Sequence, residues 1–264
     1  MYDFNYHKPD SVDEAIQLFR GAQDGVYLAG GHTLLPSMKQ RLAAPTDVID
    51  LAGIEGLCGV KSVGAGIEIG ALTAHDEVAN SPLVQSVIPA LAELASLIGD
   101  AQVRNRGTIG GSVANSDPAA DYPAGLLGLG AEIITNKRSI TADDFFTAMF
   151  ETALEEGELI TKIRFPGPEA AAYVKFPNPA SRYATVGVFI ARTRSGIRVA
   201  ITGAAPSVFR STDMEEALGG DFSVEALDGI QLDDDEMNSD LHATAEYRAH
   251  LCTVMAKRAV RKLL

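Results

Sequence analysis

Two short stretches that contain paired glycines limit the possible folds of this sequence more than any other feature. They span residues 29–36 and 108–117. Glycine has no Cβ and accepts positive φ, so the successive backbone N–H groups around a glycine pair can form a concave nest for an anion. The first stretch joins an expected apolar strand at 26–29 to an expected helix at 34–41, a junction that suits phosphate binding. Together, the two stretches predict one diphosphate held by main-chain amides.

Taken singly, each motif also fits a simpler interpretation. A glycine pair is more typical of a turn than of an anion nest. Neither stretch continues into the Gly-Lys-Ser/Thr of a P-loop, and neither has the G-x-G-x-x-G spacing of a dinucleotide-binding turn. Each motif by itself is therefore consistent with both a turn and an anion-binding nest. If the nest is correct, a valine at Gly110 is expected to block the anion while sparing the fold.

The pattern along the first half of the chain predicts a mixed helix and strand domain. Ser11 and Glu14 form a capping box before apolar residues at helical spacing, and residues 47–51 are expected to form a strand, so residues 1–54 are predicted to form a small α/β unit. The elements expected beyond it are a hairpin at 60–71, a helix capped by Thr73 and a helix at 87–98. Residues 100–120 are expected to form a long ordered loop or a loop with short strands, followed by a helix at 122–129 and strands at 133–135 and 159–165.

The clearest domain boundary is Pro166-Gly167-Pro168, because these residues break both helices and strands. After this boundary we expect three strands, at 172–176, 186–191 and 196–202, and then helical stretches that end in a helix at 243–264. With 264 residues and 46% hydrophobic content, the chain is long and apolar enough for two cores. The predicted domains are therefore 1–165 and 166–264.

Charge and cysteine content exclude several classes of function. The net charge of −13 disfavours nucleic acid and anionic lipid as partners. The two cysteines have no metal-binding spacing, and the acidic run at 233–236 has no spaced ligands after it, so no metal site is expected. No apolar run is long enough to span a bilayer, and no signal peptide is visible. We therefore expect a cytoplasmic protein.

Residues 29–39 (AGGHTLLPSMK) and 102–121 (QVRNRGTIGGSVANSDPAAD) resemble the signatures of one family. It is the FAD-binding medium subunit of molybdenum hydroxylases, which include carbon monoxide dehydrogenase and the flavin domains of xanthine, nicotine and quinoline dehydrogenases. Residues 4–9 (FNYHKP), 73–75 (TAH), 173–176 (YVKF) and 183–188 (YATVGV) are also similar. The resemblance covers nearly the whole chain.

The resemblance implies an α+β fold. It consists of a two-subdomain FAD-binding domain of the PCMH/vanillyl-alcohol-oxidase type, with subdomains 1–54 and 55–165, and a C-terminal domain with a three-stranded antiparallel sheet and a helical bundle. The implied partners are a small subunit with two [2Fe–2S] clusters and a large molybdopterin subunit, in a dimer of heterotrimers. FAD in this chain would pass electrons from the clusters to an external acceptor.

Two other functions stay open beside this one. The first is a stand-alone FAD-dependent oxidoreductase with its own substrate pocket. The second is a scaffold that has kept the fold and lost the flavin.

The resemblance also assigns cofactor-binding residues, and it assigns no catalytic ones. They are Leu28, Ala29, Gly30, Gly31, His32, Thr33, Leu34, Leu35, Thr108, Gly110, Gly111, Asn115, Asp117, Asp121, Ile160, Lys175 and Tyr183. Those in the two glycine stretches would bind the diphosphate, and Asn115 the ribityl or phosphate region. Ile160 would meet the flavin ring through its backbone. Lys175 would lie near the pyrimidine edge and Tyr183 near the isoalloxazine.

Two of these residues have alternative roles. Asp121 would lie near the flavin or its sugar-phosphate chain, and it could also cap the helix that starts at Tyr122. In more distant flavoproteins, a histidine placed like His32 carries FAD covalently. The resemblance implies that FAD is held non-covalently here.

Overall fold

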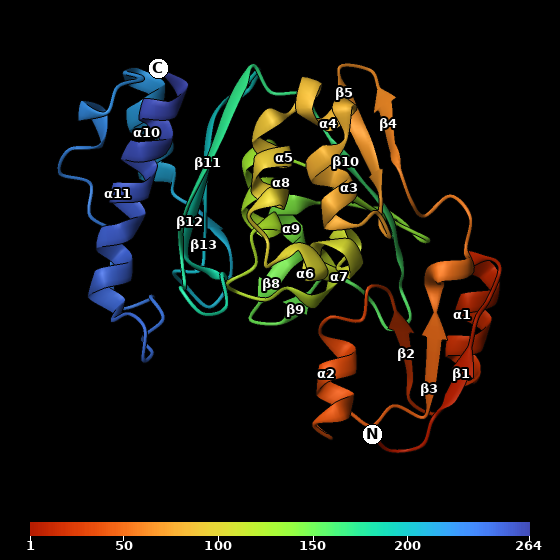
Figure 1. Cartoon of the computed structure of the whole chain (residues 1–264). Coiled ribbons are helices and arrows are strands. Elements are labelled where there is room, and N and C mark those ends of the chain that lie inside the picture. The colour runs from red at the N-terminus through yellow and green to blue at the C-terminus, as the bar shows by residue number, and fades with distance from the viewer.

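The computed structural model describes all residues from 1 to 264, arranged as an α+β protein in three packed parts (Figure 1). The first part is a small unit with a three-stranded parallel sheet in the order β1-β3-β2. Its elements are β1 (Asn5–His7), α1 (Val12–Gly21), β2 (Gly25–Leu28), α2 (Leu34–Lys39), β3 (Asp47–Asp50) and the 3-10 turn η1 (Leu51–Gly53). Ser11 caps α1 by accepting a hydrogen bond from the Glu14 amide, as the capping box predicts.

The second part is built on an antiparallel five-stranded sheet in the order β4-β5-β10-β6-β7. The strands are β4 (Val60–Val63), β5 (Gly66–Gly70), β6 (Glu132–Thr135), β7 (Ser139–Thr141) and β10 (Ile160–Phe165), with a separate hairpin of β8 (Phe146–Ala148) and β9 (Glu151–Thr152). The last strand, β10, lies between β5 and β6, so the end of this part is tied to its beginning. Ile69 and Ile163 are directly paired and fully buried on the side of the sheet that faces the core.

Seven helices accompany this sheet: α3 (His75–Asn80), α4 (Pro82–Val87), α5 (Pro89–Ser96), α6 (Ala101–Arg106), α7 (Ile109–Asn115), α8 (Tyr122–Leu129) and α9 (Ala142–Phe145). The helix expected at 87–98 is present as α5, but it starts two residues later, because Pro89 begins α5 and Ile88 separates it from α4. Proline has no N–H and pushes the preceding residue out of the helical region, and Ile88 accordingly has φ −139° and ψ 70°.

The expectation of a loop at 100–120 is wrong for most of this segment, because α6 and α7 occupy it. Each helix has a capping side chain at its start. Asp100 accepts a hydrogen bond from the Val103 amide at 2.9 Å, and Thr108 accepts one from the Gly111 amide at 3.2 Å. Thr73, expected to cap a helix, bonds the backbone of Gly59 instead, and Ala74 precedes α3.

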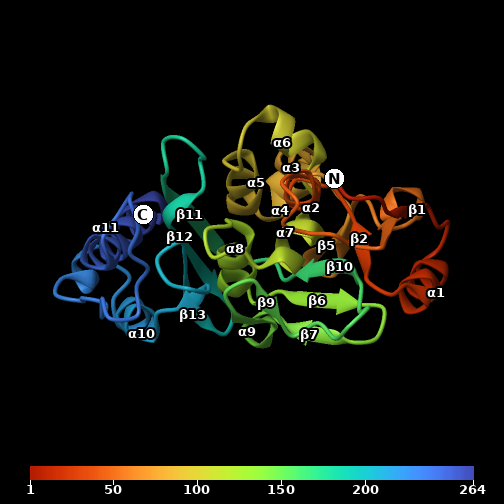
Figure 2. The same cartoon turned by 90° about the horizontal axis from the view of Figure 1, so that it is seen from below.

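The C-terminal part is an antiparallel sheet covered on both faces by helices (Figure 2). Its elements are β11 (Ala170–Pro177), β12 (Ala184–Thr193), β13 (Gly196–Thr202), β14 (Phe209–Arg210), α10 (Thr212–Gly220), the 3-10 turn η2 (Glu225–Leu227) and α11 (Ala245–Leu263). The three expected strands are present, and the two-residue β14 adds a fourth at the edge. Helices α10 and α11 cover one face, and α8 from the second part packs against the other.

Helix α8 is buried along its whole length, and it joins the second and third parts into one core. Every residue from Tyr122 to Leu129 is buried, as is typical of a helix that is apolar on all sides. Phe189 on β12 lies against it, because a Cβ at Gly128 would stand 2.6 Å from the Phe189 ring. None of the helices combines the length and the apolar character that crossing a bilayer requires.

This shared core makes a prediction. Replacing Phe189, which is fully buried, with alanine should lower the free energy of unfolding by about 4 kcal/mol, because the cavity left under α8 cannot collapse. Urea denaturation followed by circular dichroism measures this. Leu241→Ala, at a fully exposed side chain, is the control and should change stability by less than about 0.5 kcal/mol. A loss at Phe189 no larger than the control would contradict the shared core.

Candidate FAD site

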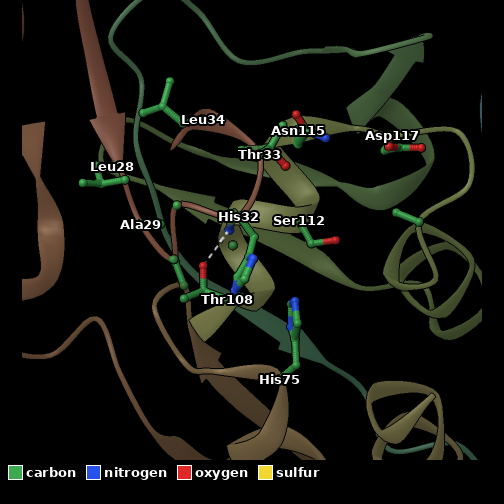
Figure 3. A pocket seen from close by; sticks show the side chains of 18 of the residues that line it. Leu28, Ala29, His32, Thr33, Leu34, His75, Thr108, Ser112, Asn115 and Asp117 are labelled. Carbon is green, nitrogen blue, oxygen red and sulfur yellow. Dashed lines mark hydrogen bonds between the residues drawn. The ribbon is translucent and has the colours of Figure 1, made fainter. Parts of the chain in front are cut away.

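A cavity of about 650 Å³ lies where the three parts meet. This volume is in the range of about 300 to 1,000 Å³ that is typical of small-molecule and cofactor sites. Its walls come from the loop after β2, from α6, α7 and the turn that follows them, from the start of β10, and from residues 181–183 between β11 and β12 (Figure 3). The glycine stretches therefore line one site although they lie about 80 positions apart in the sequence.

The first glycine stretch touches the backbone that leads directly into the second. A Cβ added to Gly30 would lie 2.0 Å from the carbonyl oxygen of Arg106 and 2.9 Å from the Cα of Gly107. A Cβ at Gly111 would lie 3.6 Å from the Cβ of Ala29. Only glycine at position 30 allows this approach, since no other residue lacks a Cβ. The convergence predicted from the motifs is confirmed.

The first stretch presents free amides. No backbone N–H from residue 29 to residue 34 donates to a protein acceptor. Gly31 has φ +76°, which turns the chain between β2 and α2. Thr33 precedes α2, and its side chain makes no capping hydrogen bond. A run of unpartnered N–H groups beside a cavity is the geometry that binds phosphate oxygens.

The second stretch differs, because its amides are already used inside the protein. The Ile109 N–H donates to the Thr73 carbonyl at 3.0 Å, and that of Gly110 donates to the Ala71 carbonyl at 2.8 Å. The Gly111 N–H donates to Thr108 Oγ1, drawn as the dashed line in Figure 3. The expectation that Gly110 and Gly111 bind through free amides is therefore wrong. They form a closely packed wall of the site.

Gly110 illustrates the difference. A Cβ there would stand 2.6 Å from the Ala71 Cβ and 2.6 Å from the Ala71 carbonyl oxygen. Valine at this position would push α7 away from the end of β5. The expectation that Gly110→Val spares the fold is thus also wrong, since the substitution disrupts packing before it meets any ligand.

Asp121 is the acidic end of a buried ion pair. It accepts a hydrogen bond from the Tyr173 hydroxyl at 2.5 Å and one from Lys175 Nζ at 2.9 Å. Burial raises the pKa of the Asp121 carboxyl, and Lys175 and Tyr173 oppose that shift. The Asp121 side chain makes no capping hydrogen bond to α8, so the capping alternative is wrong.

The ion pair places Lys175 behind the wall of the cavity. Only 3% of its side chain is exposed, and its ammonium also donates to the Leu97 carbonyl. Lys175 does not line the cavity, and Leu35 does not either, although its side chain lies next to Gly31. The structure brings together all the other predicted site residues along the cavity wall.

Asp117 and Tyr183 form the end of the cavity nearest the C-terminal part. Burial raises the pKa of the Asp117 carboxyl, which accepts the Ala119 amide in its own turn. Burial, and then the nearby carboxylates of Asp117 and Asp121, raise the pKa of the Tyr183 hydroxyl. Ile160, at the start of β10, also lines the cavity and is 4% exposed.

Two lining residues to which the sequence interpretation gave no role have notable surroundings. His75, at the start of α3, is 4% exposed, and burial lowers its imidazole pKa to about 4. Glu158 accepts hydrogen bonds from Arg138, Thr135 Oγ1 and the Glu155 amide, which hold its carboxyl pKa at about 2 despite burial. Nothing in the sequence marks Glu158, because its neighbours look like an exposed acidic turn.

The fold and the cavity together provide room for a nucleotide-sized ligand beside a run of unpartnered amides. Residues 2–168 match the model of the FAD binding domain in molybdopterin dehydrogenase. Residues 171–263 match that of the CO dehydrogenase flavoprotein C-terminal domain. The chain therefore belongs to the family of FAD-binding subunits of molybdopterin dehydrogenases, and it is an oxidoreductase subunit with FAD as its cofactor.

The similar proteins align with this chain along nearly their full length. The carbon monoxide dehydrogenase medium chain of Hydrogenophaga pseudoflava is 38% identical, over 97% of this chain and 96% of that protein. The nicotine 6-hydroxylase medium subunit of Paenarthrobacter nicotinovorans is 33% identical, over 97% and 95%. A solved carbon monoxide dehydrogenase from H. pseudoflava superposes with a TM-score of 0.90 at 38% identity, covering 98% of this chain and 96% of that one.

The contact between the glycine stretches predicts the effect of Gly30→Ala. The new methyl group would meet the Arg106 carbonyl, force the stretches apart, and weaken FAD binding by about 100-fold. Fluorescence titration of the apoprotein with FAD measures this. Gly219→Ala is the matched control, because a Cβ there meets nothing within 4 Å. Unchanged affinity in Gly30→Ala would show that the stretches need not touch.

Glu158 predicts a pH dependence of stability. Its pKa in the folded protein is about 2, below the ordinary value of 4.5. Its contribution to stability is therefore present above about pH 4.5 and is lost as the pH falls towards 2. Glu158→Gln should cost about 3 kcal/mol at pH 7 and flatten this part of the profile.

Urea unfolding at a series of pH values tests this prediction. Glu156→Gln, at an exposed side chain two positions away, should keep the wild-type profile. An unchanged profile in Glu158→Gln would contradict the assignment.

Proposed function

We propose that this chain is the electron-transfer subunit of a molybdenum-containing hydroxylase or dehydrogenase, in which FAD receives electrons from [2Fe–2S] clusters of a partner subunit and delivers them to an external acceptor. The observation that most directly supports this proposal is the run of unpartnered amides at 29–34 beside a cavity of cofactor size. FAD supplies two-electron and one-electron chemistry when bound, and the protein supplies orientation and electrostatics.

The chain's own groups divide the work of holding FAD. The amides of residues 29–34 bind the diphosphate, and Gly30, Gly110 and Gly111 keep the walls close enough for them to do so. Asp117, Asp121 and Tyr183 line the end assigned to the flavin. Lys175, which sits behind Asp121, balances the charge of that carboxylate.

FAD is held non-covalently in this proposal. His32 lies in the stretch with free amides, where main-chain hydrogen bonds suffice for binding. Acid precipitation of the holoprotein provides the test, and the yellow colour should stay in the supernatant. Colour that remains in the pellet would establish a covalent bond and overturn this part.

The proposed partners are a small subunit with two [2Fe–2S] clusters and a large molybdopterin subunit, in a dimer of heterotrimers. The full-length similarity to proteins named medium chain and medium subunit supports this. We propose a division into domains 1–165 and 166–264, with subdomains 1–54 and 55–165. Both cysteines are free thiols, which supports a cytoplasmic location.

Purification of the chain from its native host tests the proposal. A complex with an iron–sulfur chain and a molybdopterin chain should be recovered, containing one FAD per copy of this chain and showing bleaching of the flavin absorbance when substrate is added. The chain expressed alone should bind FAD but oxidise no organic substrate. If the chain alone, loaded with FAD, turned over an organic substrate, a stand-alone oxidoreductase would replace this proposal.

A further inference from the structure

The histidine at the start of α3 has an unusual hydrogen-bonding state. His75 is 4% exposed and lines the cavity, yet its Nδ1 is buried without a hydrogen-bond partner. Its Nε2 makes no hydrogen bond to the protein either, but it is not sealed off as Nδ1 is. Buried polar atoms in folded proteins are nearly always paired. An imidazole with two unused nitrogens at the wall of a binding site therefore points to a ligand.

The position of the ring fixes where that ligand lies. A Cβ at Gly107 would stand 2.6 Å from His75 Nε2, and a Cβ at Gly30 would stand 2.9 Å from the Gly107 Cα. The imidazole edge is thus next to the junction of the two glycine stretches. Figure 3 shows His75 pointing into the space between Thr108, Ser112 and His32. The free amides of the first stretch begin at this junction.

The charge of the ring follows from its neighbours. Burial, then His32, then Arg104 lower the His75 pKa to about 4, so the imidazole is neutral at pH 7. Arg104, on α6, donates to the carbonyls of Ile98 and Gly99. Glu93, on α5, is paired with Lys262. A neutral imidazole has one N–H donor and one acceptor nitrogen, and the partner of one nitrogen decides which nitrogen carries the proton.

A second orphaned group lies beside the ring. The Tyr122 hydroxyl on α8 is buried and has no hydrogen-bond partner. Its ring centroid lies 5.3 Å from that of His75, with an interplanar angle of 51°. Burial raises the pKa of the Tyr122 hydroxyl well above its usual range, so it keeps its proton. A hydrogen bond from this hydroxyl to Nδ1 would satisfy both orphaned atoms and leave the imidazole proton on Nε2.

We propose that His75 binds the diphosphate of FAD as a neutral hydrogen-bond donor through Nε2–H, and that Tyr122 positions it by donating its hydroxyl proton to Nδ1. This rests on the proposed site for FAD and adds a side chain to the main-chain amides at 29–34. The pair sets the donor before the cofactor arrives, so the imidazole itself does not have to become charged in a buried position.

Two substitutions at His75 distinguish its role as a hydrogen-bond donor from its role in packing. In His75→Leu the ring's volume is largely kept but the donor is lost, so FAD affinity should fall about 10- to 100-fold. In His75→Gln the side-chain amide can place an N–H near Nε2, so affinity should stay within about threefold of wild type. Titration of the full-length apoprotein with FAD measures both, and ADP as a competitor should show the same loss, because it carries the diphosphate without the flavin.

Tyr122→Phe tests the positioning role. It removes the hydroxyl that is proposed to fix the imidazole tautomer, so FAD affinity should drop about 2- to 10-fold while the circular dichroism spectrum of the apoprotein stays that of wild type. In protein with 15N-labelled histidine, His75 should show one protonated nitrogen, Nε2, at pH 7 with FAD bound. The chain has five histidines, so the spectrum is assignable by substitution.

Several results would overturn the proposal. They are wild-type FAD affinity in His75→Leu, equal losses in His75→Leu and His75→Gln, a loss for FAD that ADP does not share, and an imidazolium spectrum for His75. Each of these leaves the FAD site itself intact. Failure of the wild-type apoprotein to take up FAD would instead contradict the proposed function.

Discussion

The close approach of two backbones at Gly30 is the contact on which the site depends. Because position 30 has no Cβ, the loop after β2 can rest on the carbonyl of Arg106 and the Cα of Gly107. That contact fixes the small N-terminal unit against α6 and α7 and creates a cavity of about 650 Å³ between them. Side chains supply little of this geometry, so the cofactor site is mainly a property of the main chain.

The two glycine stretches have unequal roles once they meet. The first keeps its amides free for a ligand, whereas the second uses the amides of residues 109–111 to hold α7 against Thr73, Ala71 and Thr108. One wall is therefore the binding surface, and the other is a rigid support. The buried polar residues follow the same division: Asp121 and Glu158 are satisfied by protein partners, and His75 is left free to face the cavity.

Much of this arrangement could be predicted from the sequence. The strands with alternating or continuous apolar residues and helix α8 were predictable, because each has a local pattern. The convergence of the glycine stretches was predictable because both resemble signatures of one family. The sequence interpretation missed the start of α5 at Pro89 and the helices that Asp100 and Thr108 cap. Helices α6 and α7 were missed because their short, small-residue segment lacks helical periodicity. The pairing of Asp121 with Lys175 and the use of the Gly110 amide depend on contacts between distant elements, which no local pattern reveals.

The central claim is that free amides in the first stretch, rather than those in the second, bind the diphosphate of FAD. Amide hydrogen exchange measured on the full chain with and without FAD tests it most directly. FAD should slow exchange strongly at residues 29–34, and residues 109–111 should be protected already in the apoprotein. Protection by FAD that appears at 109–111 and leaves 29–34 unchanged would contradict the account.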